Sequence, residues 1–366
     1  MRGAAARTPR LKALLLLAGL SLGACAGRQP RRATETHDTH DAPIVIAHRG
    51  ASGHRPEHTL AAYALAIDMG ADFVEPDLVR TKDGVLVARH ENEIGGTTDV
   101  ARKFPERRTT KTVDGVAVTG WFVEDFTLAE LKTLRAVERL PFRSHAHDGE
   151  EPVPTFEEVL ALVERRSRET GRRIGVYPET KHPSYFRALG LPIEEPLVAA
   201  LKAHGLDRPD APVFVQSFET ANLRRLRGMT RAPLVQLMQA GGAPWDRREG
   251  PDATTYAAMA TPAGLAAVRR YADAVGVEKV MVQPVAADGS LGTPTSLVAD
   301  AHAAGLRVHV WTLRSDSTFL PRGYGGNPAA EWRRFASLGV DGIFGDFPDV
   351  GARALGRLTP RAGPRE

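Results

Sequence analysis

Cysteine is nearly absent from this sequence. Cys25 is the only one among 366 residues, so no intramolecular disulfide can form. Long hydrophobic runs are also lacking, because the apolar stretch at residues 13–24 has 12 residues, whereas a membrane-spanning helix needs about 20. Basic residues do not gather with aromatic ones on a common face, so nucleic-acid binding is not indicated. What remains is an ordinary globular composition, 42% hydrophobic and 25% charged.

The amino terminus has the pattern of an export signal. Its apolar run, residues 13–24, follows four basic residues: Arg2, Arg7, Arg10 and Lys12. The residues 22–24 (LGA) resemble a bacterial lipobox, which implies that Cys25 is lipidated and anchors the protein without spanning the membrane. A plain signal peptide cut elsewhere is the alternative. Removing residues 1–24 takes away four basic residues and no acidic ones, so the formal charge falls from +4 to 0.

One domain is predicted over residues 43–355, between a flexible tether at 25–42 and a disordered tail at 356–366. In this domain short apolar strands alternate with helical segments, which is typical of a (β/α)₈ barrel. The expected strands are 44–48, 72–79, 173–179, 212–217, 233–238, 273–276, 307–313 and 342–346. An open doubly wound sheet is the alternative, although no G-x-G-x-x-G motif follows the first strand, which argues against a dinucleotide-binding fold.

Helix signals fall between these strands. Residues 57–69 have apolar side chains at helical spacing, and Gly70 is placed to end that helix. The stretches TLAE (127–130) and TFEE (155–158) have the spacing of capping boxes. Residues 91–153 break the strand–helix rhythm and are rich in glycine, threonine and charge. We interpret them as an insertion over one mouth of the barrel.

Two predicted strands carry carboxylates, and a charge is costly to bury unless something pairs with it. Residues two apart in a strand point the same way, so Glu75 and Asp77 share one face. The same rule puts Glu179 and Lys181 on one face of the next strand, together with Tyr177. All of them lie toward the carboxyl ends of strands, where barrel enzymes keep their active sites.

A predicted hairpin places a histidine beside these carboxylates. Asp83-Gly84 is a preferred two-residue turn, which pairs Lys82 with Val85. Counting back along the two strands then pairs Asp77 with His90. Directly opposed residues have Cβ atoms about 5 Å apart, so His90 is expected beside the carboxylates. A slip of one residue would remove this pairing.

The candidate site therefore gathers two histidines, three carboxylates, a lysine and an arginine: His48, His90, Glu75, Asp77, Glu179, Lys181 and Arg49. Clustered carboxylates repel unless a cation joins them, and all-oxygen ligation favours Ca²⁺ or Mg²⁺ over zinc. A divalent cation beside two basic side chains suits a phosphate-bearing substrate. Two histidines suit general acid–base catalysis, one activating the attacking oxygen and one protonating the leaving alkoxide. Taken singly, the same residues could be structural or surface groups.

These residues lie in motifs that resemble those of the glycerophosphodiester phosphodiesterase family. The stretch AHRGASGHRPEHTLAAYALAIDMGADFVEPDLVRTKDGVLVARHE is similar to the opening signature of that family. The likeness continues through DFTLAELKTL, TFEEVL, GVYPETK, VFVQSF, LVQLM, YADAVG, WTLRSD and DGIFGDFPD. It covers residues 43–352 and is greatest to the exported, bacterial periplasmic type.

The resemblance implies a TIM barrel that hydrolyses glycerophosphodiesters, such as glycerophosphocholine and glycerophosphoethanolamine, to glycerol 3-phosphate and an alcohol. It further implies a periplasmic or extracytoplasmic, lipid-anchored protein. By position, His48 is the implied base and His90 the implied acid. The implied metal ligands are Glu75, Asp77 and Glu179, and the implied phosphate contacts are Arg49 and Lys181. Ca²⁺ is the expected metal, although the ligand set would accept Mg²⁺. Further candidates for the substrate wall are Trp311, Phe218 and Gln216.

Three positions depart from the family pattern. Glu91 follows the second histidine where Asp is usual, Gly345 replaces a common Thr, and His54 stands where an aromatic residue is frequent. Two other functions stay open at this point. One is a phospholipase D-like enzyme that cleaves intact lipids or lysolipids, which a cap formed by residues 91–153 would disfavour. The other is a non-enzymatic lipoprotein that binds phosphorylated ligands.

Overall fold

The computed structural model describes residues 42–357. The predicted signal peptide (1–24) and Cys25 lie outside the described residues, as do most of the predicted tether and tail. Arg357, which we assigned to the tail, pairs with Asp72 and donates to the carbonyl oxygens of Ala42 and Pro43. The folded domain therefore extends past residue 355. Within 42–357, no helix has both the length and the apolar character needed to cross a membrane.

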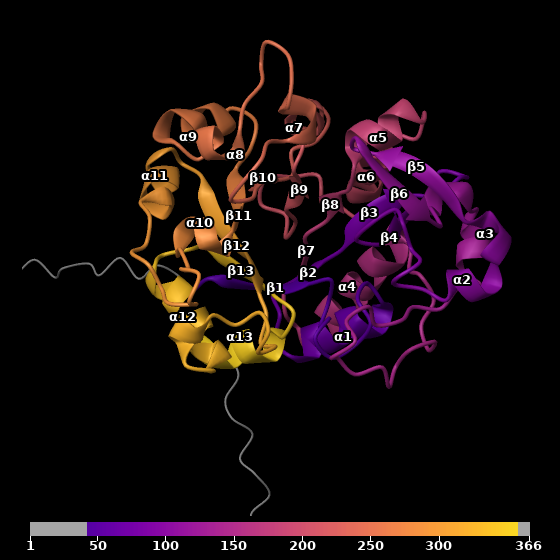
Figure 1. Cartoon of the computed structure of the whole chain (residues 1–366), viewed down its shortest axis with the longest axis horizontal. Helices are drawn as coiled ribbons and strands as arrows, with labels where there is room; N and C mark the ends of the chain where they lie inside the picture. Colours follow the sequence, from indigo (N-terminus) through magenta and orange to yellow (C-terminus); the bar gives the residue numbers. More distant parts are fainter. Residues whose placement is uncertain (1–41, 358–366) are drawn as a thin grey trace, which may run out of the picture. The chain divides into compact units, whose positions relative to one another are not determined.

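Eight parallel strands make the central sheet of the described residues, and two of them are interrupted (Figure 1). The second strand consists of β2 (Phe73–Glu75) and β3 (Asp77–Arg80), which Pro76 separates. The third consists of β7 (Gly175–Val176) and β8 (Glu179–Thr180). The uninterrupted strands are β1 (Ile44–His48), β9 (Val215–Ser217), β10 (Leu234–Met238), β11 (Ala274–Glu278), β12 (Arg307–Leu313) and β13 (Gly342–Gly345).

The sheet closes on itself through the interrupted strands. On one side β13, β1 and β2 are neighbours, and on the other β3, β8, β9, β10, β11, β12 and β13 follow in order. Because β2 and β3 are halves of one strand, the ring is complete. The predicted TIM barrel is thus confirmed, and the open doubly wound sheet is wrong. The register sets His48 opposite Glu75 and Asp77 opposite Glu179, so four candidate residues meet at the carboxyl ends of three strands.

Helices surround the barrel (Figure 1). They are α1 (Leu60–Asp68), α4 (Phe156–Thr170), α5 (Pro183–Ala188), α6 (Glu194–Ala203), α7 (Thr220–Arg227), α8 (Tyr256–Met259), α9 (Pro262–Val268), α10 (Lys279–Val282), α11 (Leu297–Ala303), α12 (Pro328–Ser337) and α13 (Pro348–Ala354). The helix predicted over 57–69 begins later than expected, because Thr59 is its N-cap and accepts from the amide of Ala62. Gly70 follows its end at φ +90°, as predicted. Both predicted capping boxes are present.

The segment 91–153 packs onto the barrel, at the right of Figure 1. It contains α2 (Val100–Lys103), α3 (Leu128–Leu131) and the antiparallel hairpin of β5 (Thr109–Val113) and β6 (Val116–Gly120). Most of its buried apolar side chains belong to the same hydrophobic core as the barrel helices: Ile94, Val100, Val123, Phe126, Leu131, Leu134 and Val153. The segment therefore has no separate core of its own.

The predicted register of the first hairpin is wrong by one residue. The strand β4 (Leu86–Ala88) pairs Leu78 with Ala88, and the Arg89 amide donates to the Asp77 carbonyl. Arg89, not His90, thus stands opposite Asp77. The reason is a three-residue loop closed by Thr81 and Val85, in which Gly84 has φ +86°. Such a loop, ending in a left-handed glycine, is the next most common hairpin after the two-residue turn.

Gly345, where the family commonly has Thr, is explained by packing. A Cβ at this position would come within 2.4 Å of the indole of Trp332, which is 1% exposed and lies against the end of β13. The indole fills the space that a larger residue would need. His54, at the other unusual position, contacts the ring of Phe347 edge-on and pairs with Asp349 at 3.1 Å.

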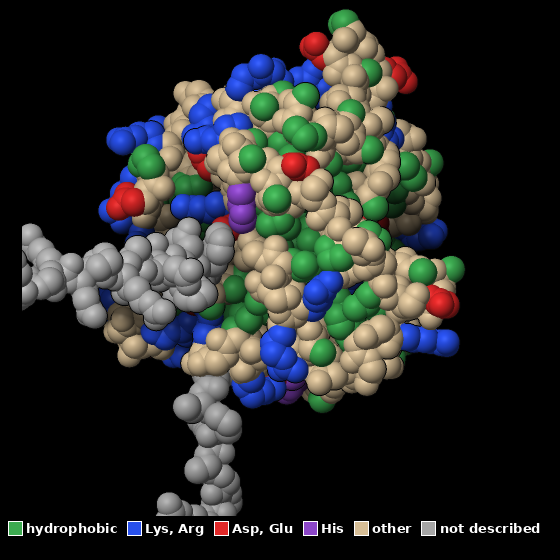
Figure 2. All heavy atoms as spheres, turned by 90° about the vertical axis from the view of Figure 1, so that its left-hand side faces the viewer, with side chains coloured by type: hydrophobic (Ala, Val, Ile, Leu, Met, Phe, Trp, Pro, Cys, Tyr) green, Lys and Arg blue, Asp and Glu red, His purple; other side chains and the backbone are tan. Residues whose placement is uncertain are grey.

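Basic side chains on the face seen in Figure 2 are scattered among apolar and uncharged ones. This face therefore presents no continuous basic surface of the kind that binds a nucleic-acid backbone.

Candidate active site

Three buried carboxylates meet at the carboxyl end of the barrel. Glu75, Asp77 and Glu179 each place an oxygen within 4.8 Å of the others, and each is at most 7% exposed. Burial and the charges of Asp77 and Glu179 raise the pKa of Glu75 well above its usual value. Burial also raises the pKa of Glu179, to about 8. The Asp77 Oδ1 atom is buried without a hydrogen-bond partner. Crowded oxygen donors with a free buried lone pair fit a hard divalent cation.

Neighbouring side chains orient two of these carboxylates. Glu75 accepts from the backbone N–H of Arg49 at 2.8 Å and from the amide of Gln216 at 3.1 Å. Glu179 pairs with Lys181, whose Nζ lies 3.1 Å from Oε1. The structure therefore brings together four residues that the sequence grouped: Glu75, Glu179, Arg49 and Lys181. Sequence reasoning assigned Gln216 only a minor role at the substrate wall.

His58 orients the third carboxylate, and sequence reasoning missed it. Its Nε2 lies 2.9 Å from Asp77 Oδ2, and its Nδ1 lies 2.7 Å from the hydroxyl of Tyr63. Burial favours the neutral acid, but the hydrogen bond from His58 and the nearby positive charges, that of Lys181 first, together keep the pKa of Asp77 well below its usual range. The one available signal was the position of His58 just before Thr59, the cap of α1.

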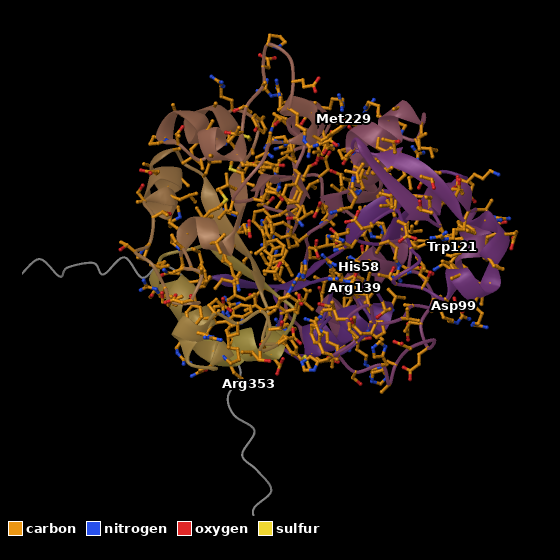
Figure 3. All side chains as sticks on the ribbon, viewed as in Figure 1. His58, Asp99, Trp121, Arg139, Met229 and Arg353 are labelled. Carbon is orange, nitrogen blue, oxygen red and sulfur yellow. The ribbon has the colours of Figure 1, made fainter. Side chains whose placement is uncertain are left out.

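Arg49 is buried among acidic groups. It has φ +59°, its Nη1 donates to both oxygens of Glu57 at 3.1 and 3.0 Å, and its Nε lies 3.6 Å from Asp77. Glu57 also accepts from the Nε of Arg139 at 2.7 Å. Figure 3 labels Arg139 and His58, which reach the mouth from the segment 91–153 and from the loop before α1. Part of the Arg49 guanidinium is thus committed to Glu57.

His48 forms a short contact with an aspartate that we did not predict. Its Nδ1 lies 2.6 Å from Asp346 Oδ1, and Asp346 also accepts from Arg143 at 2.6 Å. Burial favours the neutral acid, but the hydrogen bond to His48 and the nearby positive charges, including that of Arg143, together hold the pKa of Asp346 well below its usual range. Burial, followed by the charge of Arg49, lowers the pKa of His48 to about 4. Because Asp346 is ionised, Nδ1 of His48 carries the proton and Nε2 keeps its lone pair.

His90 reaches the same mouth although its predicted strand pairing is wrong. It lies beyond the end of β4, with its side chain 31% exposed and its Nδ1 2.9 Å from Glu91 Oε1. It is close enough for its charge to lower the pKa of Asp77. Burial and the charges of Arg49 and Lys181 lower the pKa of His90 to about 3.

Two predicted wall residues contact one another beside the carboxylates. The rings of Phe218 and Trp311 meet edge to face, with centroids 5.8 Å apart. Phe218 lines a hollow of about 180 Å³ together with Glu179 and Lys181. Trp311 donates from its indole nitrogen to the carbonyl of Gly276 at 3.1 Å. Phe218 is therefore the nearer of the two to the carboxylate site.

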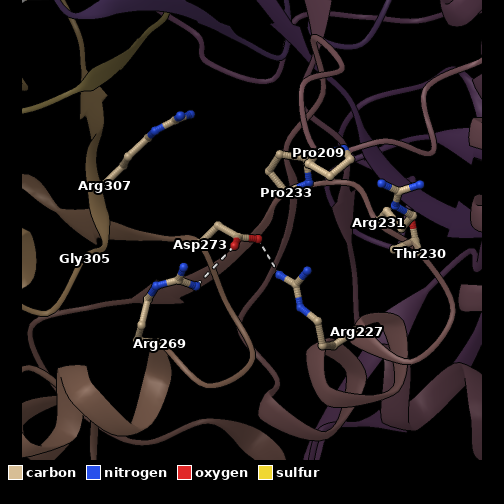
Figure 4. A pocket seen from close by; sticks show the side chains of 9 residues that line it. All are labelled: Pro209, Arg227, Thr230, Arg231, Pro233, Arg269, Asp273, Gly305 and Arg307. Atoms are coloured by element: carbon tan, nitrogen blue, oxygen red, sulfur yellow. Dashed lines mark hydrogen bonds and ion pairs between the residues drawn. The ribbon is translucent and has the colours of Figure 1, made fainter. Parts of the chain in front are cut away.

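A larger hollow of about 530 Å³ opens near the amino-terminal ends of β11 and β12 (Figure 4). Arg227 and Arg269 both pair with Asp273, the one acidic residue that lines this hollow. It holds none of the histidines or clustered carboxylates described above. The chemistry-bearing groups converge at the other end of the barrel, where Glu179 and Lys181 also line the smaller hollow, and that end is the candidate active site.

Comparisons with known proteins identify the family of this chain. The profile of the glycerophosphoryl diester phosphodiesterase family matches residues 48–350. A glycerophosphodiester phosphodiesterase of Arabidopsis thaliana is 36% identical over 355 residues, covering 91% of this chain and 93% of that protein. One from Haemophilus influenzae is 33% identical over 373 residues, covering 94% and 97%.

Solved structures show the same fold. A putative glycerophosphoryl diester phosphodiesterase from Silicibacter pomeroyi aligns with a TM-score of 0.61 and 24% identity, over 86% of this chain and 94% of that one. An Oleispira antarctica phosphodiesterase in complex with the product sn-glycerol-3-phosphate aligns with a TM-score of 0.55 and 22% identity, over 86% and 97%. The family profile match and the two relatives show that the chain belongs to the glycerophosphoryl diester phosphodiesterase family.

Proposed function

We propose that this chain hydrolyses glycerophosphodiesters, such as glycerophosphocholine and glycerophosphoethanolamine, to glycerol 3-phosphate and an alcohol. The observation that carries the proposal is the buried trio of Glu75, Asp77 and Glu179, flanked by His48 and His90 at one mouth of the barrel. The names of the relatives and the product bound to the Oleispira phosphodiesterase support it.

The carboxylate trio would hold a divalent cation, for which we propose Ca²⁺, with Mg²⁺ as the alternative. When bound, such a cation offsets negative charge on the phosphoryl oxygens. Glu75, Asp77 and Glu179 supply only oxygen donors, which is the preference of both ions. Lys181 lies beside Glu179 and is assigned to the phosphate, and Arg49 adds a second positive charge beside Asp77.

We assign His48 as the base. Its Nδ1 is held by Asp346, which leaves the Nε2 lone pair to accept a proton from the attacking oxygen. With its pKa lowered to about 4, His48 is unprotonated at neutral pH, as a base must be. Asp346 in turn stabilises the imidazolium that forms.

We assign His90 as the acid that protonates the leaving alkoxide. In the free chain the charges of Arg49 and Lys181 oppose its protonation. A bound phosphodiester brings negative charge against those two cations, which favours the imidazolium. Glu91, in contact with Nδ1, favours the same form.

The alternative activity is cleavage of intact or lysophospholipids in the manner of a phospholipase D. The hollow beside Glu179, about 180 Å³, is lined mostly by polar and charged side chains, which suits a polar alcohol better than an acyl chain. The segment 91–153 also packs beside this mouth, where Arg139 contacts Glu57.

Product analysis separates these activities. The purified protein is incubated with glycerophosphocholine, sphingomyelin and lysophosphatidylcholine in parallel. We expect glycerol 3-phosphate and choline from the first, with no turnover of the two lipids. Release of choline from sphingomyelin or lysophosphatidylcholine, with glycerophosphocholine left intact, would show the phospholipase D-like activity instead.

We further propose that the protein is anchored outside the cytoplasm through a lipid on Cys25. The basic residues, the apolar run at 13–24 and the LGA stretch before Cys25 support this. Labelled palmitate should enter the wild-type protein during growth and fail to enter Cys25→Ser. Equal labelling of both would contradict the anchor.

A further inference from the structure

His90 is the last member of a row of four side chains. Its Nδ1 lies 2.9 Å from Glu91 Oε1, and Glu91 Oε2 lies 2.9 Å from His182 Nε2. On its other side, His182 Nδ1 lies 2.7 Å from Asp114 Oδ2. The four groups come from three places: the end of the first hairpin, the start of α5, and the turn between β5 and β6. The hairpin of the segment 91–153 is thereby linked to the barrel mouth.

The pattern of contacts fixes the charges in this row. Both ring nitrogens of His182 face carboxylate oxygens, and only an imidazolium donates from both. The hydrogen bonds to Asp114 and Glu91 outweigh burial and raise the pKa of His182 to about 9. The charged groups facing it are Asp114, Glu91 and, with the opposite sign, Lys181. His182 is therefore a cation held between two carboxylates.

Glu91 needs such a partner to orient a histidine. Its side chain is 47% exposed, and an exposed glutamate samples many rotamers. Restricting it to one of them costs conformational entropy. Here His90 contacts one of its oxygens and His182 the other. These two contacts hold the Glu91 carboxylate in one orientation, and its contact with Nδ1 then restricts the orientation of the His90 ring.

We propose that Asp114 and His182 are positioning residues, which act through Glu91 to hold the His90 ring so that Nε2 faces the leaving oxygen. This inference rests on the proposed function, in which His90 is the acid. It gives the β5–β6 hairpin a part in the acid step that sequence reasoning did not assign to it. Because Nδ1 contacts Glu91, Nε2 is the ring nitrogen that is left for the substrate.

The test compares two substrates that differ only in their need for an acid. Choline leaves as a basic alkoxide and needs a proton, whereas p-nitrophenol leaves as a stable anion and needs none. We measure kcat for glycerophosphocholine and for glycerophospho-p-nitrophenol in Asp114→Asn, His182→Asn, Glu91→Gln and His90→Ala. Residues 114 and 182 have φ +47° and +46°, which asparagine adopts readily, so the first two changes keep the local backbone.

We expect Asp114→Asn and His182→Asn to lower kcat about 10-fold for the choline ester and little for the p-nitrophenyl ester. A general acid contributes about 10²–10⁴-fold to the rate, and misplacing it should remove part of that contribution. His90→Ala should show the same preference more strongly. The matched control is His145→Asn, since His145 pairs with Asp148 in the same segment and touches none of the four groups. It should leave both rates unchanged. Because both rates come from one preparation, their ratio does not depend on the folded fraction.

One result would overturn this inference and leave the proposed acid intact. In it, Asp114→Asn and His182→Asn lower kcat equally for both esters, while His90→Ala still strongly prefers the p-nitrophenyl ester. Such a result would mean that the row only fastens the hairpin to the barrel. Equal losses in His90→Ala itself would overturn both the inference and the assignment of His90 as the acid.

Discussion

Prolonged treatment with EDTA should abolish glycerol 3-phosphate release from glycerophosphocholine, and Ca²⁺ should restore it better than Mg²⁺. Without a cation, the crowded oxygens of Glu75, Asp77 and Glu179 offer the substrate phosphate no positive charge to offset its own. Charge offset by a metal is worth several kcal/mol at the transition state, so the rate should fall by roughly 10³-fold. Asp77→Asn should lower activity similarly and should not be rescued by added Ca²⁺ at concentrations that saturate the wild type.

The matched control for this experiment is Glu331→Gln. Glu331 is a carboxylate that is 1% exposed and pairs with Lys279 at 2.8 Å, far along the chain from the mouth. Its variant should keep both the activity per folded molecule and the response to EDTA. Full activity of the wild type after exhaustive chelation would refute the cation site, whereas better rescue by Mg²⁺ would refute only our choice of ion.

The second large effect is expected from the two histidines. His48→Ala removes the base and His90→Ala the acid, and each should lower kcat by about 10²–10⁴-fold, the usual contribution of a positioned proton-transfer group. KM should change less, because neither ring is assigned to ground-state binding. His204→Ala is the control, since His204 also contacts carboxylates, those of Glu157 and Glu164 at the end of α6.

The same variants decide whether the protein is an enzyme at all. A non-enzymatic protein that binds phosphorylated ligands would give wild-type and histidine variants with the same background rate. A measurable wild-type rate that survives in both His48→Ala and His90→Ala would instead place the chemistry on other residues. Circular dichroism and a thermal unfolding midpoint establish that each variant is folded.

Barrel strands and the carboxylate trio could be predicted from the sequence because both depend on local rules. Alternation along a strand puts Glu75 and Asp77 on one face whatever the strand pairs with. The strand at 72–79 was therefore predicted correctly, although Pro76 divides it into β2 and β3. Similarly, the capping boxes at Thr127 and Thr155 depend only on residues three apart.

The partners of these residues could not be predicted, because long-range packing brings them in. Asp346 is 298 positions from His48, and Arg143 reaches Asp346 across 203 positions. The His90 register failed for a different reason. A turn of two residues and one of three differ by a single left-handed glycine, and the motif at Asp83-Gly84 is compatible with both.

The interruptions in the second and third strands limit how the barrel wall can slide. Pro76 and Pro178 have no N–H to offer, yet their carbonyl oxygens still accept from Glu179 and Gln216, so the ladder runs on across both breaks. If the strand register shifted by one residue, each proline would face a backbone carbonyl oxygen to which it has no N–H to donate. A one-residue slip is the misalignment that would turn the acidic side chains outward, and the two prolines make it unfavourable. The backbone alone therefore keeps these side chains directed into the barrel mouth.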